Sequence, residues 1–222
     1  MNSPDGPGSA RIGNHRDMDH LHTPPAIAAD APILIIGAGQ AATFTAEALR
    51  SGGHAGPITL LGDEPVGPYH RPPLSKAWLA GTMTDEALAL RTPEMLTRKQ
   101  ITLRTGARVQ AIDRAAGTVT LADGERLPWS GLVLATGARP RSLPLPGIAA
   151  AGVLALRSRA DAVELAAGLA DCRARKLPLV VIGGGFIGLE VASTARQMGL
   201  EVCVLEAAPR LLARVLAPEL SD

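Results

Sequence analysis

The sequence predicts an α/β protein with two βαβ units joined by an antiparallel β-meander. Two observations carry this prediction: an apolar run, a glycine-rich corner and a helix-like segment follow one another at 31–50, and again at 179–199. A third observation is the alternation of apolar and polar residues at 108–121, which is typical of antiparallel strands. The order strand, glycine corner, helix is typical of Rossmann-like folds that bind dinucleotides.

The first corner has the pattern G-x-G-x-x-A and follows an apolar, β-branched strand. Gly37 permits the tight turn, Gly39 lets the backbone approach a pyrophosphate, and the small Ala42 lets helix and strand pack closely. The first amides of the helix, with about half a positive charge from its dipole, would face the diphosphate. The predicted contacts are Gly37, Ala38, Gly39, Gln40, Ala41 and Ala42.

A carboxylate stands at the tip of the next predicted strand, Ile58–Leu61, where βαβ units usually hold a ribose hydroxyl. Asp63 lies 26 residues after Gly37, beyond the usual interval of about 20, and the intervening Gly-rich loop accounts for the surplus. We predict that Asp63 or Glu64 binds the ribose. The alternative is that both are solvated turn residues.

The second corner carries the full G-x-G-x-x-G pattern after the strand 179–182. A helix at 191–199 and a strand at 201–205 follow, and that strand ends at Glu206, 23 residues after Gly183. A carboxylate in this place favours NAD(H), because it repels the 2′-phosphate of NADP, although the nearby Arg210 would soften the preference. The predicted contacts are Gly183, Gly185, Phe186, Ile187, Gly188 and Glu206.

The other predicted elements follow from turn signals and periodicity. A helix at 94–99 has Thr92 as its cap and Pro93 at its first position. The remaining elements are a short helix at 74–79 that ends at Gly81, strands at 101–104 and 131–134, a meander that includes 108–113 and 118–121, and an amphipathic helix at 159–175.

Composition excludes several classes of protein. The chain has 222 residues, a net charge of +1 and only 2% aromatic residues, so nucleic-acid binding is not indicated, and its apolar runs are too short to cross a membrane. Cys172 and Cys203 stand alone, which predicts buried thiols in a reducing compartment and a cytoplasmic protein. Residues 1–30 are predicted to be a disordered leader. The alternative, a metal site at His15, His20 and His22, has no accompanying cysteine or carboxylate scaffold, so no metal is predicted.

With the segment R-P-P-L-S-K at 71–76, the pattern becomes specific. Together with G-x-G-x-x-A and G-D-E, it resembles the FAD-dependent NADH:ferredoxin reductases that serve oxygenases and cytochromes P450, in the pyridine nucleotide-disulfide oxidoreductase superfamily. The resemblance covers residues from about 31 to the end and implies FAD at the first corner and NADH at the second. Electrons would pass to an acidic iron–sulfur ferredoxin. The resemblance makes no prediction of oligomeric state.

The resemblance also implies individual roles. Lys76 would lie beside the isoalloxazine ring and pair with Glu190, and these two are the predicted catalytic residues. Phe186 would stand between flavin and nicotinamide. Further flavin contacts would come from Arg71, the backbone of Val109, the strand exit Ala135–Thr136–Gly137, and Arg157. The alternatives are a surface lysine for Lys76, a solvated helical carboxylate for Glu190 and a linker arginine for Arg157.

The resemblance implies an FAD domain at 31–147 and an NAD domain at 148–222, both incomplete, because family members continue with further strands and a C-terminal domain. Positions 63–100 contain no cysteine, so electrons would leave without a thiol relay. The alternatives are a related flavin NADH reductase of the rubredoxin or nitrite reductase type, and a truncated, non-catalytic nucleotide-binding remnant.

Overall fold

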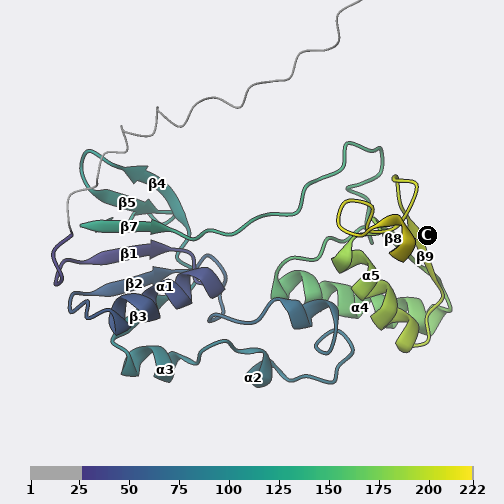
Figure 1. Cartoon of the computed structure of the whole chain (residues 1–222), viewed down its shortest axis with the longest axis horizontal. Coiled ribbons are helices and arrows are strands. Elements are labelled where there is room, and N and C mark those ends of the chain that lie inside the picture. The colour runs from purple at the N-terminus through teal and green to yellow at the C-terminus, as the bar shows by residue number, and fades with distance from the viewer. Residues whose placement is uncertain (1–26, 222) are drawn as a thin grey trace, which may run out of the picture.

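The protein folds into two lobes, which Figure 1 shows side by side and joined by extended segments. The structure is a computed structural model that describes residues 27–221. His15, His20 and His22, considered above as a metal site, and most of the predicted leader lie outside the described residues. The boundary between domains at 147 stays a prediction.

The first lobe is built on a four-stranded parallel sheet with the order β3-β2-β1-β7. Its strands, in that order, are Ile101–Arg104, Ile58–Leu61, Ile33–Ile36 and Gly131–Leu134. The central strand β1 pairs in parallel with β2 on one side and β7 on the other. All four strands agree with the segments expected from the sequence.

The central strand is apolar throughout because both faces of its sheet are covered. Ile33 and Ile35 pack with helix α1 (Gln40–Ser51) and helix α3 (Pro93–Arg98), whereas Leu34 and Ile36 pack against the meander. The meander strands are β4 (Val109–Asp113), β5 (Thr118–Leu121) and β6 (Arg126–Pro128), in that antiparallel order. Burial on both faces is the reason that a parallel strand has a continuous apolar run.

The segment between β2 and β3 differs in one place from the sequence prediction. The predicted helix at 74–79 is a short 3₁₀ helix, η1 (Pro72–Ser75), followed by turns up to Gly81. The helix does not continue because Lys76 has φ −126° and ψ −113°, outside the helical region. Farther on come α2 (Asp85–Leu88) and α3, whose Thr92 cap and first-position Pro93 are confirmed.

The second lobe contains α4 (Arg159–Arg175), β8 (Leu179–Ile182), α5 (Phe186–Gln197), β9 (Val202–Leu205) and a terminal 3₁₀ helix, η2 (Pro218–Leu220). Helix α4 has the predicted bounds. Helix α5 begins five residues earlier than predicted, directly after the glycine corner. Strands β8 and β9 pair in parallel, and no third strand joins them within the described residues.

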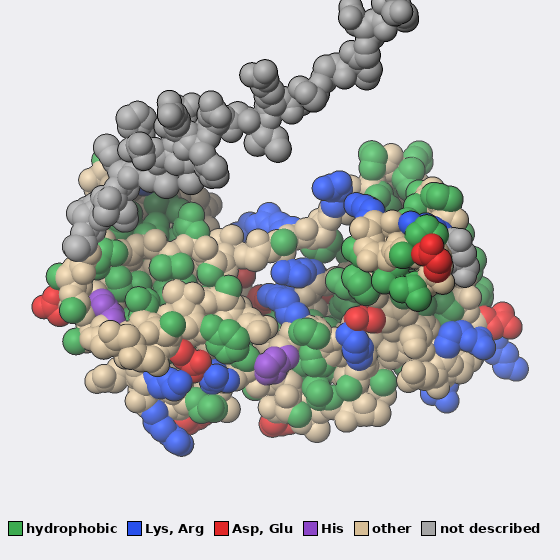
Figure 2. All heavy atoms as spheres, viewed as in Figure 1, with side chains coloured by type: hydrophobic (Ala, Val, Ile, Leu, Met, Phe, Trp, Pro, Cys, Tyr) green, Lys and Arg blue, Asp and Glu red, His purple; other side chains and the backbone are tan. Residues whose placement is uncertain are grey.

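The β8–β9 sheet is covered on only one face. Val181 packs toward the helical side and is buried, whereas Val180, Ile182 and Leu205 are more than half exposed. Figure 2 shows hydrophobic side chains gathered over this lobe. Cys203, predicted to be a buried thiol, is exposed because it alternates onto the bare face; Cys172 is half-buried in the helical cluster.

A carboxylate in α1 links the helical layer to the chain on either side of α3. Glu47 accepts hydrogen bonds from Arg91 Nε at 2.7 Å and from Lys99 Nζ at 2.8 Å, and its side chain is 12% exposed. The bond from Arg91 is the chief reason that the pKa of Glu47 falls to about 2, and Lys99 lowers it further against the opposing effect of burial.

Because this pKa is lowered on folding, the pair stabilises the fold above pH about 4.5 and the contribution is lost as pH falls toward 2. Glu47→Gln should reduce the free energy of unfolding by about 1–2 kcal/mol at pH 7, since it leaves two cations without their anion. Urea unfolding followed by circular dichroism at several pH values measures this, with exposed Asp171→Asn as the control. A loss that stayed constant from pH 7 to pH 3 would contradict the assignment.

Candidate functional site

The first glycine corner is a close contact between two sequence motifs. Gly37 has φ +119°, and a Cβ at this position would lie 2.1 Å from the carbonyl oxygen of Ala135. Only glycine fits there, because any side chain would collide with the backbone that leaves β7. The corner is therefore held against the predicted strand exit Ala135–Thr136–Gly137, and the amide of Gly37 donates to the carbonyl of Leu61.

The space in front of α1 fits an anion. Gly39 is the N-cap, no side chain caps the helix, and a Cβ on Gly39 would meet nothing within 4 Å. Ala42 is fully buried, as close packing of helix and strand requires. The predicted contacts Ala38, Gln40 and Ala41 occupy the half-buried or exposed rim of this corner. Free amides at a helix N-terminus suit a diphosphate, so the residues present fit a dinucleotide.

The structure separates the two candidate ribose ligands. Both carboxylate oxygens of Glu64 are engaged: one accepts from Tyr69 Oη at 2.6 Å and the other from Arg71 Nη2 at 2.7 Å. Asp63 is exposed at the tip of β2. Glu64 is therefore engaged by its neighbours whereas Asp63 faces solvent, and which of the two binds a ribose stays a prediction.

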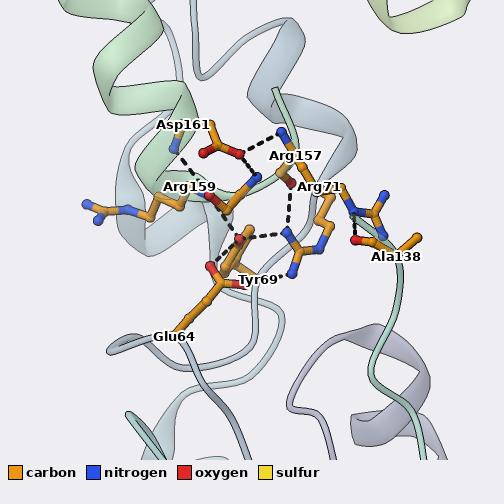
Figure 3. Close-up of polar contacts among 8 residues, drawn as sticks. Glu64, Tyr69, Arg71, Ala138, Arg157, Arg159 and Asp161 are labelled. Carbon is orange, nitrogen blue, oxygen red and sulfur yellow. Dashed lines mark hydrogen bonds and ion pairs between the residues drawn. The ribbon is translucent and has the colours of Figure 1, made fainter. Parts of the chain in front are cut away.

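Tyr69 is the centre of a network between the lobes (Figure 3). Its hydroxyl donates to Glu64 and accepts from Arg71 Nη1 at 3.0 Å and from the backbone amide of Arg159, at the start of α4, at 2.9 Å. Burial, and then the bond to Glu64, raises the pKa of Tyr69 above its ordinary value. The hydroxyl therefore stays protonated and keeps its donor role at neutral pH.

Arg71 and Arg157 extend this network toward the strand exit. Arg71 Nη1 also donates to the carbonyl oxygen of Arg157 at 2.7 Å, and Arg157 Nε donates to the carbonyl of Ala138 at 3.2 Å. The amide of Arg157 in turn donates to Asp161, which closes the capping box of α4 with Ser158. Two arginines predicted separately thus lie together beside the exit from β7 (Figure 3).

The predicted catalytic pair is formed. Lys76 Nζ lies 2.7 Å from Glu190 Oε1, and Ser75 Oγ donates to Glu190 Oε2 at 2.6 Å. The bond from Lys76 is the main reason that the pKa of Glu190 lies below its usual value, with Ser75 second. Lys76 is 49% exposed and Glu190 30%, so the pair is accessible to a ligand.

A cavity of about 260 Å³ brings several predicted residues together. It is lined by residues of the connecting segment, by Leu156 and Arg157, and by the first turns of α5, and five of its residues are predicted site residues: Arg71, Lys76, Arg157, Ile187 and Glu190. A second cavity, of about 590 Å³, lies beside the same ion pair and is lined by Phe186 and Thr194 among others. Figure 2 shows Lys and Arg side chains in the hollow between the lobes.

The second glycine corner repeats the geometry of the first. Gly183 has φ +107°, Gly185 is an uncapped N-cap with open space around it, and a Cβ on Gly188 would lie 2.2 Å from the carbonyl of Gly183. Phe186 and Ile187, in the first turn of α5, are both more than half exposed. The corner therefore fits a second dinucleotide.

Glu206 lies against this corner, as the sequence predicts. Its Oε2 accepts from the amide of Gly184 at 2.7 Å and its Oε1 from that of Ala208 at 2.8 Å. These bonds, that of Ala208 first, hold the pKa of Glu206 below its usual value. Arg210 donates to the carbonyls of Leu216 and Ala213 and to a serine hydroxyl, and its effect on the preference against NADP stays a prediction.

The predicted residue Val109 is not among the residues that line the two cavities, and three residues of the site were not predicted. Val109 lies half-buried at the start of β4, opposite Leu121, and contributes to the core beneath the sheet. Tyr69, Ser75 and Thr194 belong to the site but were not predicted. The only sequence signal for Tyr69 is its place two residues before Arg71, and for Thr194 its place one helical turn after Glu190.

Among residues 27–221, no helix is both long and apolar enough to cross a bilayer. Over the same part of the chain, no three or more His, Cys, Asp or Glu side chains are grouped so as to hold a metal ion.

Known proteins share both the sequence pattern and the arrangement of elements. A family described as pyridine nucleotide-disulphide oxidoreductase matches residues 31–222. Rhodocoxin reductase from Rhodococcus erythropolis is 49% identical over 85% of this chain and 43% of its own length, and putidaredoxin reductase from Pseudomonas putida is 45% identical over 85% and 44%. A crystal structure of the ferredoxin reductase for the CYP199A2 system from Rhodopseudomonas palustris aligns with a TM-score of 0.81 and 43% identity, over 86% of this chain and 46% of that one. The chain thus spans less than half the length of these relatives.

The Tyr69 network predicts a loss of contact between the lobes when the hydroxyl is removed. Tyr69→Phe should lower the free energy of unfolding by about 1–3 kcal/mol, because a buried hydroxyl with three partners disappears. It should also speed hydrogen exchange at the Arg159 amide. Thr82→Val, which removes a single exposed hydroxyl contact, is the control. Unchanged stability together with unchanged exchange at Arg159 would refute the role of the network.

Proposed function

Because the chain belongs to the pyridine nucleotide-disulphide oxidoreductase family, we propose that it carries the FAD- and NADH-binding segments of an FAD-dependent NADH:ferredoxin oxidoreductase. The observation that supports this most directly is the Lys76–Glu190 ion pair, which joins the two lobes beside a cavity lined by Arg71 and Arg157. The names of the relatives support the ferredoxin-reductase assignment.

The first corner is proposed to hold the diphosphate of FAD, with Asp63 on the ribose and Val109 and the Ala135–Gly137 exit near the flavin. When bound, FAD accepts a hydride from NADH and releases electrons singly. Lys76 would hold a positive charge beside the ring as the ring gains negative charge, and Glu190 would keep that amine in place. Arg71 and Arg157 would fix the side of the cavity nearest the strand exit.

The second corner is proposed to hold NADH, with its diphosphate at the N-terminus of α5 and its ribose near Glu206. Phe186, exposed in the first turn, would cover the nicotinamide side. The electron acceptor is proposed to be an acidic iron–sulfur ferredoxin, and the protein to act in the cytoplasm. Rubredoxin as acceptor, or a non-catalytic nucleotide-binding remnant, are the alternatives that the experiment below separates.

The test begins with the purified chain incubated with excess FAD and then desalted. We expect the visible absorbance of bound flavin, bleached by NADH under anaerobic conditions. Lys76→Met and Glu190→Ala should each slow flavin reduction about tenfold, equivalent to ~1.4 kcal/mol of barrier, in stopped-flow experiments.

Lys176→Met, at the exposed end of α4, is the matched control and should reduce at the wild-type rate. Equal rates in all variants would reject the catalytic pair. A colourless protein that binds neither nucleotide would reject the proposed function, and nucleotide binding without flavin reduction would favour the remnant. Reoxidation by rubredoxin in preference to a 2Fe–2S ferredoxin would select the rubredoxin type.

Glu206 gives a separate prediction about the choice of nucleotide. A 2′-phosphate about 5 Å from this carboxylate would cost roughly 3 kcal/mol per charge at an effective dielectric constant near 20, before salt and relaxation reduce it. Glu206→Ala should therefore raise the ratio of NADPH to NADH affinity by about fivefold or more, since one third of that energy gives this factor. Titration of each nucleotide by calorimetry measures the ratio. Glu201→Ala changes the residue just before β9 begins, at the opposite end of the strand from Glu206, and should leave this ratio unchanged.

A further inference from the structure

Two buried hydroxyl residues meet across the lobes directly behind the Lys76–Glu190 pair. Thr194 in α5 is 5% exposed, and Ser75, the residue before Lys76, is 4% exposed. Thr194 Oγ1 donates to the backbone carbonyl of Ser75 at 2.8 Å. Burial of polar groups is unfavourable unless they are paired, so breaking this bond between distant parts of the chain would be costly.

Helix α5 holds Ser75 at two points. Glu190 accepts from the Ser75 hydroxyl, and Thr194, four residues later on the same helix face, donates to the Ser75 carbonyl. We call these two contacts the Ser75 clasp. Because both partners lie on one rigid helix, the clasp fixes the position and the direction of the residue from which Lys76 continues.

Lys76 depends on such an anchor. Its own backbone amide donates to the carbonyl of Pro73, but its side chain is half exposed and has four rotatable bonds, so an exposed ion pair alone would hold it weakly. The Pro72–Ser75 turn ends at Lys76 in a non-helical conformation, so no continuing helix supports it. Lys76 Nζ also lies 3.5 Å from the carbonyl oxygen of Pro72, and the Lys76 carbonyl accepts from the amide of Ala80, but both contacts stay within the same segment. The clasp ties this segment to α5, the helix that carries Glu190.

We propose that Thr194 is a positioning residue, which holds the Lys76–Glu190 pair in register through the backbone of Ser75. The expected effect of Thr194 on flavin reduction rests on the proposed function, whereas its expected effect on the position of Lys76 does not. The two can therefore be tested separately, the placement in the chain alone and the consequence in the flavin-loaded protein.

The first experiment measures how fast acetic anhydride modifies Lys76. The chain has three lysines, Lys76, Lys99 and Lys176, so mass spectrometry can resolve each one, and the exposed Lys176 serves as an internal reference. Thr194→Val keeps the shape of the side chain and removes the donor. We expect acetylation of Lys76 to rise about threefold relative to Lys176, because a loosened, half-exposed ion pair leaves the amine free for a larger share of the time. Thr194→Ser keeps the hydroxyl and should keep the wild-type ratio.

A second variant is available in case Thr194→Val does not fold. If Thr194→Val fails to unfold cooperatively, Ser75→Ala replaces it, since it removes the other half of the clasp and should raise acetylation of Lys76 similarly. A wild-type ratio in the folded variant would overturn the proposal. An equal rise in Thr194→Ser would also overturn it, because the effect would then not depend on the hydroxyl.

In the flavin-loaded protein, Thr194→Val should lower the limiting rate of flavin reduction by about fivefold with the NADH dissociation constant unchanged within about twofold. Thr194→Ser should restore the rate. A change confined to NADH affinity would overturn the positioning role. Failure of the chain to bind flavin would reject the proposed function, and the acetylation ratio would then decide by itself whether the clasp positions Lys76.

Discussion

The eight residues from Tyr69 to Lys76 must satisfy their buried polar groups with two helices of the other lobe, and the site depends on this constraint. The Tyr69 hydroxyl reaches the first amide of α4, and Ser75 reaches two side chains of α5. Each contact joins residues at least 90 positions apart in the sequence. Because an unpaired buried polar group is costly, the segment has one favourable position between the helices. That position carries Arg71 and Lys76 to the same cavity.

The helices that follow the two glycine corners have no side-chain cap. Each leaves an uncapped N-terminus of a twelve-residue helix open to solvent, with no Cβ to fill the space. The other three α-helices of the described residues are capped: Thr84, Thr92 and Ser158 each accept from a backbone amide of the helix that follows. The absence of caps at α1 and α5 coincides with the pattern that leaves room for a diphosphate, and an anion there would take the place of the missing side chain.

Sequence reasoning succeeded where the cause is local and failed where it is not. The strands, the corners and helix α4 follow from apolar runs, glycine spacing and periodicity, which neighbouring residues determine. The helix expected at 74–79 is wrong because the backbone of Lys76 lies outside the helical region, directly after Ser75, whose carbonyl accepts from Thr194 of α5. Tyr69 and Thr194 gave only a weak signal, since the contacts that bring them into the site, with the Arg159 amide and the Ser75 carbonyl, join residues far apart in the chain. Cys203 is exposed because sheet coverage, a tertiary property, decides its burial.

The two lobes also differ in how they are stabilised, because the segment at 69–81 contributes to the core of the second lobe. Strand β1 is buried on both faces, so the first lobe has its own core, whereas β8 and β9 are covered on one face only. Leu79, from the connecting segment, completes the core of the second lobe with Leu169, Val191, Ala195 and Leu200. Burying such a leucine contributes about 1.5–3 kcal/mol, so the second lobe draws part of its stability from the first. A ligand that binds across both lobes would therefore stabilise the less complete one by mass action, and its affinity would include the free energy of holding the lobes together.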